Sequence, residues 1–218
     1  MERTEAISKL KQLIGSDLYE IAREYRVPIK GKSGRKNKGW AGHTIERYLG
    51  LPLNSSQCPN FGSWELKVVP LKKLRNGKIK FKETMAITMI DPINVINTLF
   101  EDSHLYLKLR KVVVVTRLDD EEKSFVKGVF EINLDDNPNI FKQVKKDYEE
   151  VRNILINASS PEEGLKKLSG EMGVYIQPRT KGKGHGSISR AFYARKQFLE
   201  CFFTPENIQE DSTGENLF

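Results

Sequence analysis

Two charged residues, Glu65 and Lys67, lie two positions apart in SWELKVVP (63 to 70), a segment that alternates in the manner of a β-strand. Because successive side chains of a strand point to opposite faces, the two share one side. A carboxylate beside an ammonium group suits phosphodiester hydrolysis, since the first can bind a divalent cation and the second can orient or deprotonate the attacking water. Glu-x-Lys is also frequent in lysine-rich chains, where an exposed, salt-bridged strand is the simpler interpretation.

The residues ahead of this strand favour the hydrolytic interpretation. PNFG (59 to 62) predicts a turn directly before it, and WAGHTIERYLG (40 to 50) predicts a helix that ends at Gly50 and carries Glu46. Asn60 stands in that turn, where a nuclease of this pattern has an aspartate. A neutral amide offers one weak oxygen ligand where a carboxylate supplies charge and up to two, so we expect weakened Mg²⁺ binding.

The elements that must position these residues form a mixed α/β pattern. Apolar residues that recur every three or four positions predict helices over 5 to 25 (broken near Gly15), 92 to 99, 140 to 156, a short stretch through Leu168, and 191 to 203. Strands are predicted over 80 to 90, 105 to 117 with a buried run at 112 to 115, and 124 to 133. Glycine-rich basic loops are expected at 29 to 39 and 178 to 189.

Composition limits the class of protein. The chain has 218 residues, two cysteines, a net charge of +7 and a pI near 9.3, which favour one domain, a reducing compartment and a polyanionic partner. No apolar run approaches the ~18 residues that a membrane span needs, so we expect a soluble, cytoplasmic protein without a membrane partner. The GKS triplet (31 to 33) is no P-loop, because Arg26 stands where that motif needs glycine.

Together these motifs resemble the MutH/Sau3AI-type family of GATC-specific DNA endonucleases, within the PD-(D/E)xK nuclease superfamily. The strongest match is KGWAGHTIERYLG followed by PNFGSWELKVVP, and further segments fall in the family's order: LIGSDLYEIA (13 to 22), LKLRKVVVV (107 to 115), YIQPRTKG (175 to 182) and AFYARKQF (191 to 198). The resemblance implies a restriction-endonuclease-like α/β fold, a mixed β-sheet flanked by helices, with two lobes about a DNA-binding cleft. We predict a single domain over 1 to 203 and a flexible tail over 204 to 218.

The resemblance implies a role for each residue of this chain that matches a position of the family's motifs. Glu65 resembles the metal-binding glutamate, Lys67 the catalytic lysine, and Glu46 the helix glutamate that supports the metal site. Asn60 takes the place of the metal-binding aspartate, so the expected Mg²⁺ ligands are Glu46, Asn60 and Glu65. Lys108 falls where the family has a further active-site lysine able to contact phosphate, although a surface lysine is the alternative.

The resemblance also implies that an Arg-x-Lys segment enters the major groove and reads GATC. Arg179 and Lys181 are therefore assigned to base contact, which suits donors facing guanine O6 and N7. Thr180 stands between them, where the mismatch-repair enzyme has proline. Further DNA-binding candidates are Lys183, His185, Tyr193, Arg195 and Lys196, whereas Phe192 and Phe198 are expected in the core. His43 and His104 have no partner at metal-ligand spacing and are interpreted as structural or surface residues.

The predicted function is that of a type II restriction enzyme that cuts double-stranded DNA at GATC-type sites with Mg²⁺. We interpret Asn60 as an inactivating Asp-to-Asn exchange that weakens or removes the metal. The alternatives are a methyl-directed mismatch-repair nickase and a naturally non-catalytic DNA-binding homologue. One active site per chain predicts transient dimerisation on DNA, since a double-strand break requires two cuts.

Overall fold

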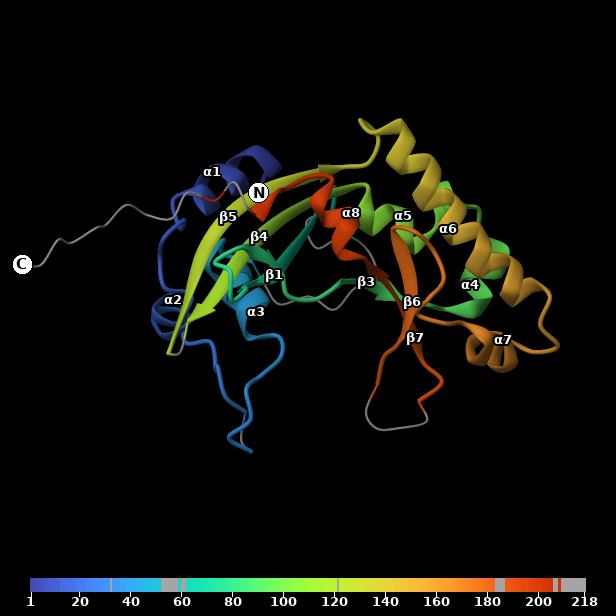
Figure 1. Ribbon diagram of the computed structural model, residues 1–218, viewed down its shortest axis with the longest axis horizontal. Helices are drawn as coiled ribbons and strands as arrows, with labels where there is room; N and C mark the ends of the chain where they lie inside the picture. Colours follow the sequence, from blue (N-terminus) through green and yellow to red (C-terminus); the bar gives the residue numbers. More distant parts are fainter. Residues whose placement is uncertain are drawn as a thin grey trace, which may run out of the picture.

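The computed structural model describes residues 1 to 31, 33 to 51, 59, 62 to 120, 122 to 182, 187 to 205 and 208. Helices and strands alternate along much of this chain (Figure 1). The helices are α1 (Arg3–Lys11), α2 (Leu18–Glu24), α3 (Trp40–Tyr48), α4 (Pro92–Asn97), the 3-10 helix η1 (Phe100–Asp102), α5 (His104–Leu109), α6 (Pro138–Ile156), α7 (Pro161–Lys167) and α8 (Lys196–Glu200). The strands are β1 (Glu65–Lys73), β2 (Ile79–Phe81), β3 (Met85–Met89), β4 (Lys111–Asp120), β5 (Lys123–Asn133), β6 (Ile176–Thr180) and β7 (Arg190–Ala194).

The first sheet has the strand order β2-β1-β4-β5. β1 runs parallel to β4, with Glu65 opposite Val112, and β4 pairs with β5 in antiparallel orientation. On its other edge, β1 is covered by β2 only from Leu71 to Lys73. The first half of β1 therefore has one edge that no described strand of this sheet covers.

Two hydrophobic cores share this sheet, because its strands are buried on both faces. On one face, α1, α2 and α3 pack through residues such as Leu10 and Trp40 onto Val113 and Val115. On the other face, Val112 and Val114 pack with α4 to α6 and the second sheet. Figure 1 shows α1 and α2 on one side of β1 and β4, and α4 to α6 on the other. The predicted mixed sheet flanked by helices is confirmed, as is the buried run at 112 to 115, each of whose side chains has 0% exposure.

The second sheet has the strand order β3-β7-β6. A buried carboxylate of α6, that of Asp147, binds the chain at the start of β6. Asp147 of α6, 2% exposed, accepts hydrogen bonds from the backbone N–H groups of Val174 (2.9 Å), Tyr175 (2.7 Å) and Ile176 (2.8 Å). A buried charge needs such donors, because an uncompensated carboxylate in an apolar interior is costly. This contact fixes where β6 begins.

Most of the predicted helices are confirmed, but the strand predicted over 105 to 117 is wrong in its first part. Residues 104 to 109 form α5, whose first turn is capped by the Ser103 hydroxyl accepting from the Tyr106 N–H at 3.1 Å. Leu105 and Leu109, four residues apart, are both buried on one helix face. Lys108 therefore projects from a helix that ends just before β4.

Three further predictions need correction. The strand predicted over 80 to 90 is divided into β2 and β3, which belong to different sheets. The helix predicted over 191 to 203 begins as β7, and only 196 to 200 are helical. The loop predicted over 178 to 189 starts as strand, since β6 continues to Thr180 opposite Arg190. Short apolar runs such as 191 to 194 fit a buried strand as well as a helix, and pairing with two neighbours decides for the strand. Phe192 and Phe198 are buried, as predicted.

No helix among the described residues is long and apolar enough to cross a membrane.

Candidate active site and DNA interface

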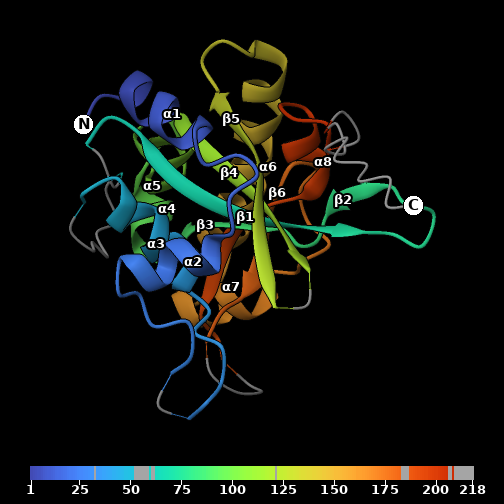
Figure 2. The ribbon, with the colours of Figure 1, turned by 90° about the vertical axis from the view of Figure 1, so that its left-hand side faces the viewer.

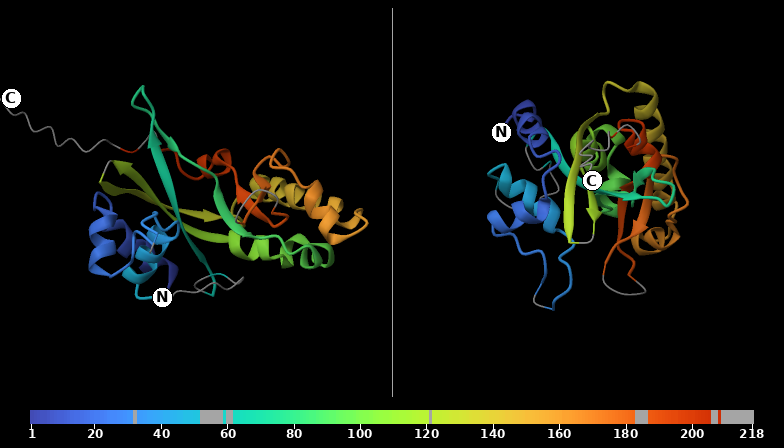
Figure 3. Two further views of the ribbon diagram at one scale, coloured as in Figure 1. Left: turned by 90° about the horizontal axis from the view of Figure 1, so that it is seen from below. Right: turned by 60° about the vertical axis from the view of Figure 1, so that its left-hand side comes forward.

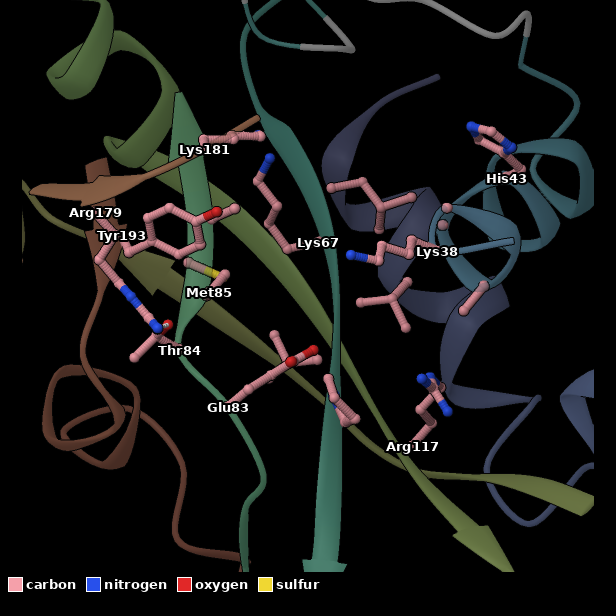
Figure 4. Close-up of a pocket in the computed structure, with 18 of the residues that line it drawn as sticks. Lys38, His43, Lys67, Glu83, Thr84, Met85, Arg117, Arg179, Lys181 and Tyr193 are labelled. Carbon is pink, nitrogen blue, oxygen red and sulfur yellow. Dashed lines mark hydrogen bonds between the residues drawn. The ribbon is translucent and has the colours of Figure 1, made fainter. Parts of the chain in front are cut away.

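A cleft of about 680 Å³ lies between α3 and the second sheet, against the open edge of β1. Its floor is the β1 segment from Leu66 to Pro70. Its two walls come from α3 on one side and from the second sheet on the other, as the labelled side chains show (Figure 4). The sequence-predicted residues that line it are Glu46, Lys67, Arg179, Thr180, Lys181 and Tyr193.

Glu65 lies at the start of this floor with 1% of its surface exposed. Its Oε1 atom is 2.7 Å from the Lys67 Nζ atom and 3.6 Å from the Lys108 Nζ atom. Burial disfavours a lone carboxylate, and two ammonium groups offset that cost. The strand alternation that the sequence predicts is confirmed, because Leu66 turns to the core of α1 to α3 and Val69 to the other core.

Glu46 enters from α3 and faces the same region. Burial raises the pKa of its carboxyl above the usual range; the nearby Glu65 carboxylate raises it further, while His43 and Lys67 oppose the shift. The negative charge of Glu65 therefore opposes ionisation of Glu46 by electrostatic repulsion. A cation between them would relieve that repulsion, as in other sites built from carboxylate oxygens.

The described donors fit a hard divalent cation in chemical type. Glu46 and Glu65 supply anionic oxygens, and Asn60, the third expected ligand, lies outside the described residues. Within the described part of the chain, no three His, Cys, Asp or Glu side chains form a metal-binding group. A metal site here would therefore depend on residue 60 in addition to the two glutamates.

Lys181, predicted to contact bases, lies beside the lysines of the floor. Burial lowers the pKa of its ammonium group, and Lys67 and Lys108 lower it further. Figure 4 shows the Lys181 side chain next to that of Lys67. This concentration of positive charge at one end of the cleft suits an anionic ligand such as a phosphate.

Arg179 lies further along the same wall, on β6. Its guanidinium donates a 2.8 Å hydrogen bond to the Thr84 hydroxyl and stands 5.5 Å above the ring centre of Tyr193 on β7. Thr180 follows at the end of β6, with an exposed side chain. Lys183 and His185 lie outside the described residues, so their DNA contacts stay predictions.

Arg195 and Lys196 are not among the described residues that line the cleft. The Arg195 guanidinium donates to the carbonyls of Gly170 (2.8 Å), Met172 (2.9 Å) and Gly173 (3.1 Å), which ties the start of α8 to the chain ahead of β6. Its observed contacts are therefore internal. Lys196 is the first residue of α8.

Sequence reasoning missed several residues of the cleft. His43, interpreted as a structural or surface residue, lines it from the same face of α3 as Glu46, three residues on. That spacing was visible in the sequence. Thr84 and Arg117 also line the cleft, but no motif marked them. Arg117 stands 5.3 Å above the Trp40 ring, and only the pairing of β4 with β1 brings it there.

Comparisons with known proteins agree with this geometry. A family model described as "DNA mismatch repair enzyme MutH" matches residues 49 to 152, which include Glu65, Lys67 and Lys108. The type II restriction enzyme Sau3AI of Staphylococcus aureus is 25% identical over 193 residues, covering 86% of this chain and 37% of Sau3AI. The mismatch-repair protein MutH of Actinobacillus pleuropneumoniae serotype 3 (strain JL03) is 26% identical over 212 residues, covering 89% of each chain.

The fold, the cleft and these matches define a class, the DNA endonucleases with a mixed α/β fold. Within that class, the family model and the relatives support a MutH/Sau3AI-type endonuclease. It spans little more than a third of Sau3AI but most of MutH. A solved complex of the restriction endonuclease MvaI with its cognate DNA covers 85% of this chain at 13% identity and a TM-score of 0.32, a likeness too low to carry a conclusion.

Proposed function

We propose that this chain is a Mg²⁺-dependent endonuclease that hydrolyses phosphodiester bonds of double-stranded DNA at GATC-type sites, as a cytoplasmic type II restriction enzyme. One observation carries the proposal. Buried Glu65 lies between the ammonium groups of Lys67 and Lys108 at the open edge of β1, beside a cleft that Glu46 also lines. The relatives named MutH and Sau3AI support the same chemistry.

The residues divide the work as follows. Glu46 and Glu65, with residue 60, would hold Mg²⁺, which when bound stabilises negative charge on the phosphate and acidifies water. Lys67 lines the cleft with 21% of its side chain exposed, so its ammonium can meet a phosphate oxygen or orient the attacking water. Lys108 is buried and its Nζ atom lies 3.6 Å from the same Glu65 oxygen, an ion pair that holds the carboxylate in place.

The residue at position 60 sets the activity of the chain as it stands. Asparagine keeps the shape of aspartate but lacks its charge, so we propose that this chain is an Asp-to-Asn form with weak Mg²⁺ binding and little cutting. DNA binding is expected to persist, because the lysines and arginines of the cleft are unchanged.

Restoring the carboxylate tests the proposal. The Asn60→Asp protein, incubated with GATC-containing plasmid and Mg²⁺, is expected to cut, whereas the parent chain and an Asn60→Ala control are expected to cut far more slowly. Duplexes with unmethylated, hemimethylated and fully methylated sites would then define the substrate. If the Asn60→Asp protein binds these duplexes and never cuts any of them, the chain is a DNA-binding homologue and the endonuclease proposal fails.

The second candidate function is that of a mismatch-repair nickase. It is favoured by the match to MutH along 89% of both chains, where Sau3AI is matched over 37% of its length. A restriction enzyme is expected to break both strands and, with one site per chain, to dimerise transiently on its target. Nicking without linear product, by a protein that sediments as a monomer on uncut duplex, would favour the nickase instead.

A further inference from the structure

The hairpin formed by the end of β1 and by β2 carries charge that the catalytic site does not use. Between Leu71 and Lys82 the sequence LKKLRNGKIKFK has six cations and no acid, against a net charge of +7 for the whole chain. Five of the six are Lys72, Arg75, Lys78, Lys80 and Lys82, and all five are exposed. None of these five forms an ion pair with a described residue.

The hairpin separates its apolar and charged side chains onto two faces. Leu71, Ile79 and Phe81 are buried in the core beneath it. The alternate positions of both strands hold lysines, and Lys72 lies directly opposite Lys80. Like charges paired across strands destabilise a sheet, so this face is arranged at a cost that a polyanionic ligand would remove.

The lysine face continues the floor of the cleft. Leu66, Lys67, Val68, Val69 and Pro70 line the cleft along β1, and Lys72 lies two residues beyond Pro70, on the face of the strand that carries Leu66, Val68 and Pro70. Across the hairpin, the Lys82 N–H donates to the Pro70 carbonyl at 2.9 Å, and Glu83 and Thr84, which follow, line the cleft again. The cleft therefore opens onto the base of the hairpin.

The hairpin reaches well past the site. Both views of Figure 3 show it extending from the body of the molecule at the far end of β1, as does Figure 2. At about 3.3 Å per residue, Lys72 lies roughly 16 Å along β1 from Lys67. That distance corresponds to about five base pairs of duplex at 3.4 Å each.

We propose that the β1–β2 hairpin is a second DNA-binding surface, whose lysine face holds the phosphate backbone of the duplex that flanks the site being read and cut. The inference rests on the proposed function only in taking double-stranded DNA as the ligand of the cleft. The hairpin contributes affinity without sequence preference, because phosphate contacts position a protein and do not read bases. A duplex too short to extend beyond the cleft would not contact the hairpin, so its affinity would not depend on the hairpin lysines.

The test compares Lys72→Gln/Lys80→Gln with a matched control, Lys142→Gln/Lys146→Gln, which removes the same charge from exposed positions on α6. Binding is measured without divalent cation, by fluorescence anisotropy over a range of salt, on duplexes of about 8 and about 30 base pairs centred on GATC, the first of which ends short of the hairpin. On the long duplex, the hairpin variant is expected to bind about tenfold more weakly at low salt, with a log–log salt slope shallower by about 2. On the short duplex, the variant and the control should agree within about twofold.

Equal affinities and slopes of the two double variants on the long duplex would overturn the hairpin proposal. So would an equal loss by the hairpin variant on both duplex lengths. Removing the facing lysines relieves repulsion, so the variant's melting temperature should not fall and misfolding would not mimic the result. These measurements need no cleavage, so failure of the nuclease proposal would leave them interpretable.

Discussion

The floor of the cleft and the wall formed by the second sheet hold their charged side chains in different ways. On the floor, Glu65 is almost fully buried and ion-paired with Lys67 on the same strand and with Lys108 on α5. On the wall, Arg179 is exposed and held by one neutral hydroxyl, on Thr84, and by the ring of Tyr193. Chemistry needs fixed groups, whereas base reading needs donors that reach out of the protein surface. Substitutions on the floor should therefore change rate, and those on the wall should change affinity and selectivity.

The largest effects are expected on the floor, and Lys67 is one of the two residues concerned, together with Glu65. In the Asn60→Asp protein, Lys67→Met should lower the single-turnover cleavage rate by about 1,000-fold, within the range for loss of a positioned proton-transfer group. The dissociation constant for uncut duplex should change little. Lys181→Met is the matched variant on the wall, and it should weaken binding more than it slows cutting. If both substitutions changed rate and affinity in the same proportion, floor and wall would not differ as described.

The next effect concerns the anchor of the wall. Asp147→Ala leaves three backbone N–H groups, that of buried Ile176 among them, without their acceptor, so the free energy of unfolding should fall by about 3 kcal/mol. Chemical denaturation measures this loss. Glu150→Ala, an exposed acid on the same helix, is the control and should stay within about 0.5 kcal/mol of the parent. An equal, small change in both variants would show that Asp147 does not anchor β6.

The pH dependence of cleavage should report on Glu46. Its pKa is raised by burial and by Glu65, so the carboxyl takes up a proton at a higher pH than an ordinary glutamate. Cation binding needs the ionised form, and the cleavage rate of the Asn60→Asp protein should therefore fall about tenfold per pH unit below that raised pKa. Because ionisation of Glu46 costs folding stability as pH rises, Glu46→Gln should raise the melting temperature at neutral pH. A lowered melting temperature would contradict this assignment.

The smallest effect is expected at Thr84, on the wall. Thr84→Val removes the hydroxyl that receives the Arg179 hydrogen bond, so binding to a GATC duplex should weaken about fivefold, as for loss of one ordinary hydrogen bond. Discrimination against sites with one changed base should fall as well, while kcat stays the same. Thr84→Ser keeps the hydroxyl and should restore binding. A drop in kcat with unchanged discrimination would show that Thr84 acts in the chemical step and not in base recognition.

The positions of the charged side chains on the floor of the cleft could be predicted from the sequence better than the contacts within its wall. Strand alternation placed Glu65 and Lys67 on one side of β1, and helical spacing placed Glu46 on α3, because both periodicities are local. The wall depends on pairing between segments nearly 100 residues apart, such as Thr84 with Arg179. Local periodicity carries no information on such a contact.

Two elements were predicted wrongly from the sequence, and in both cases the contacts that decide the structure are not local. The run AFYA (191 to 194) suits a helix or a buried strand, and its place between β3 and β6 made it a strand. Lys108 was expected on a strand, yet it reaches Glu65 from a helix because α5 ends just where β4 begins beside β1. The role predicted for Lys108 does not depend on that error, since the ion pair itself brings it to the site.

The most direct measurement is the single-turnover cleavage of a GATC duplex by the Asn60→Asp protein over a range of Mg²⁺ concentrations, with and without Glu65→Gln. We predict saturable, Mg²⁺-dependent cutting that Glu65→Gln reduces by at least about 1,000-fold while uncut duplex still binds. Cutting at the same rate by the Glu65→Gln protein would show that the buried carboxylate between Lys67 and Lys108 is not the centre of the chemistry.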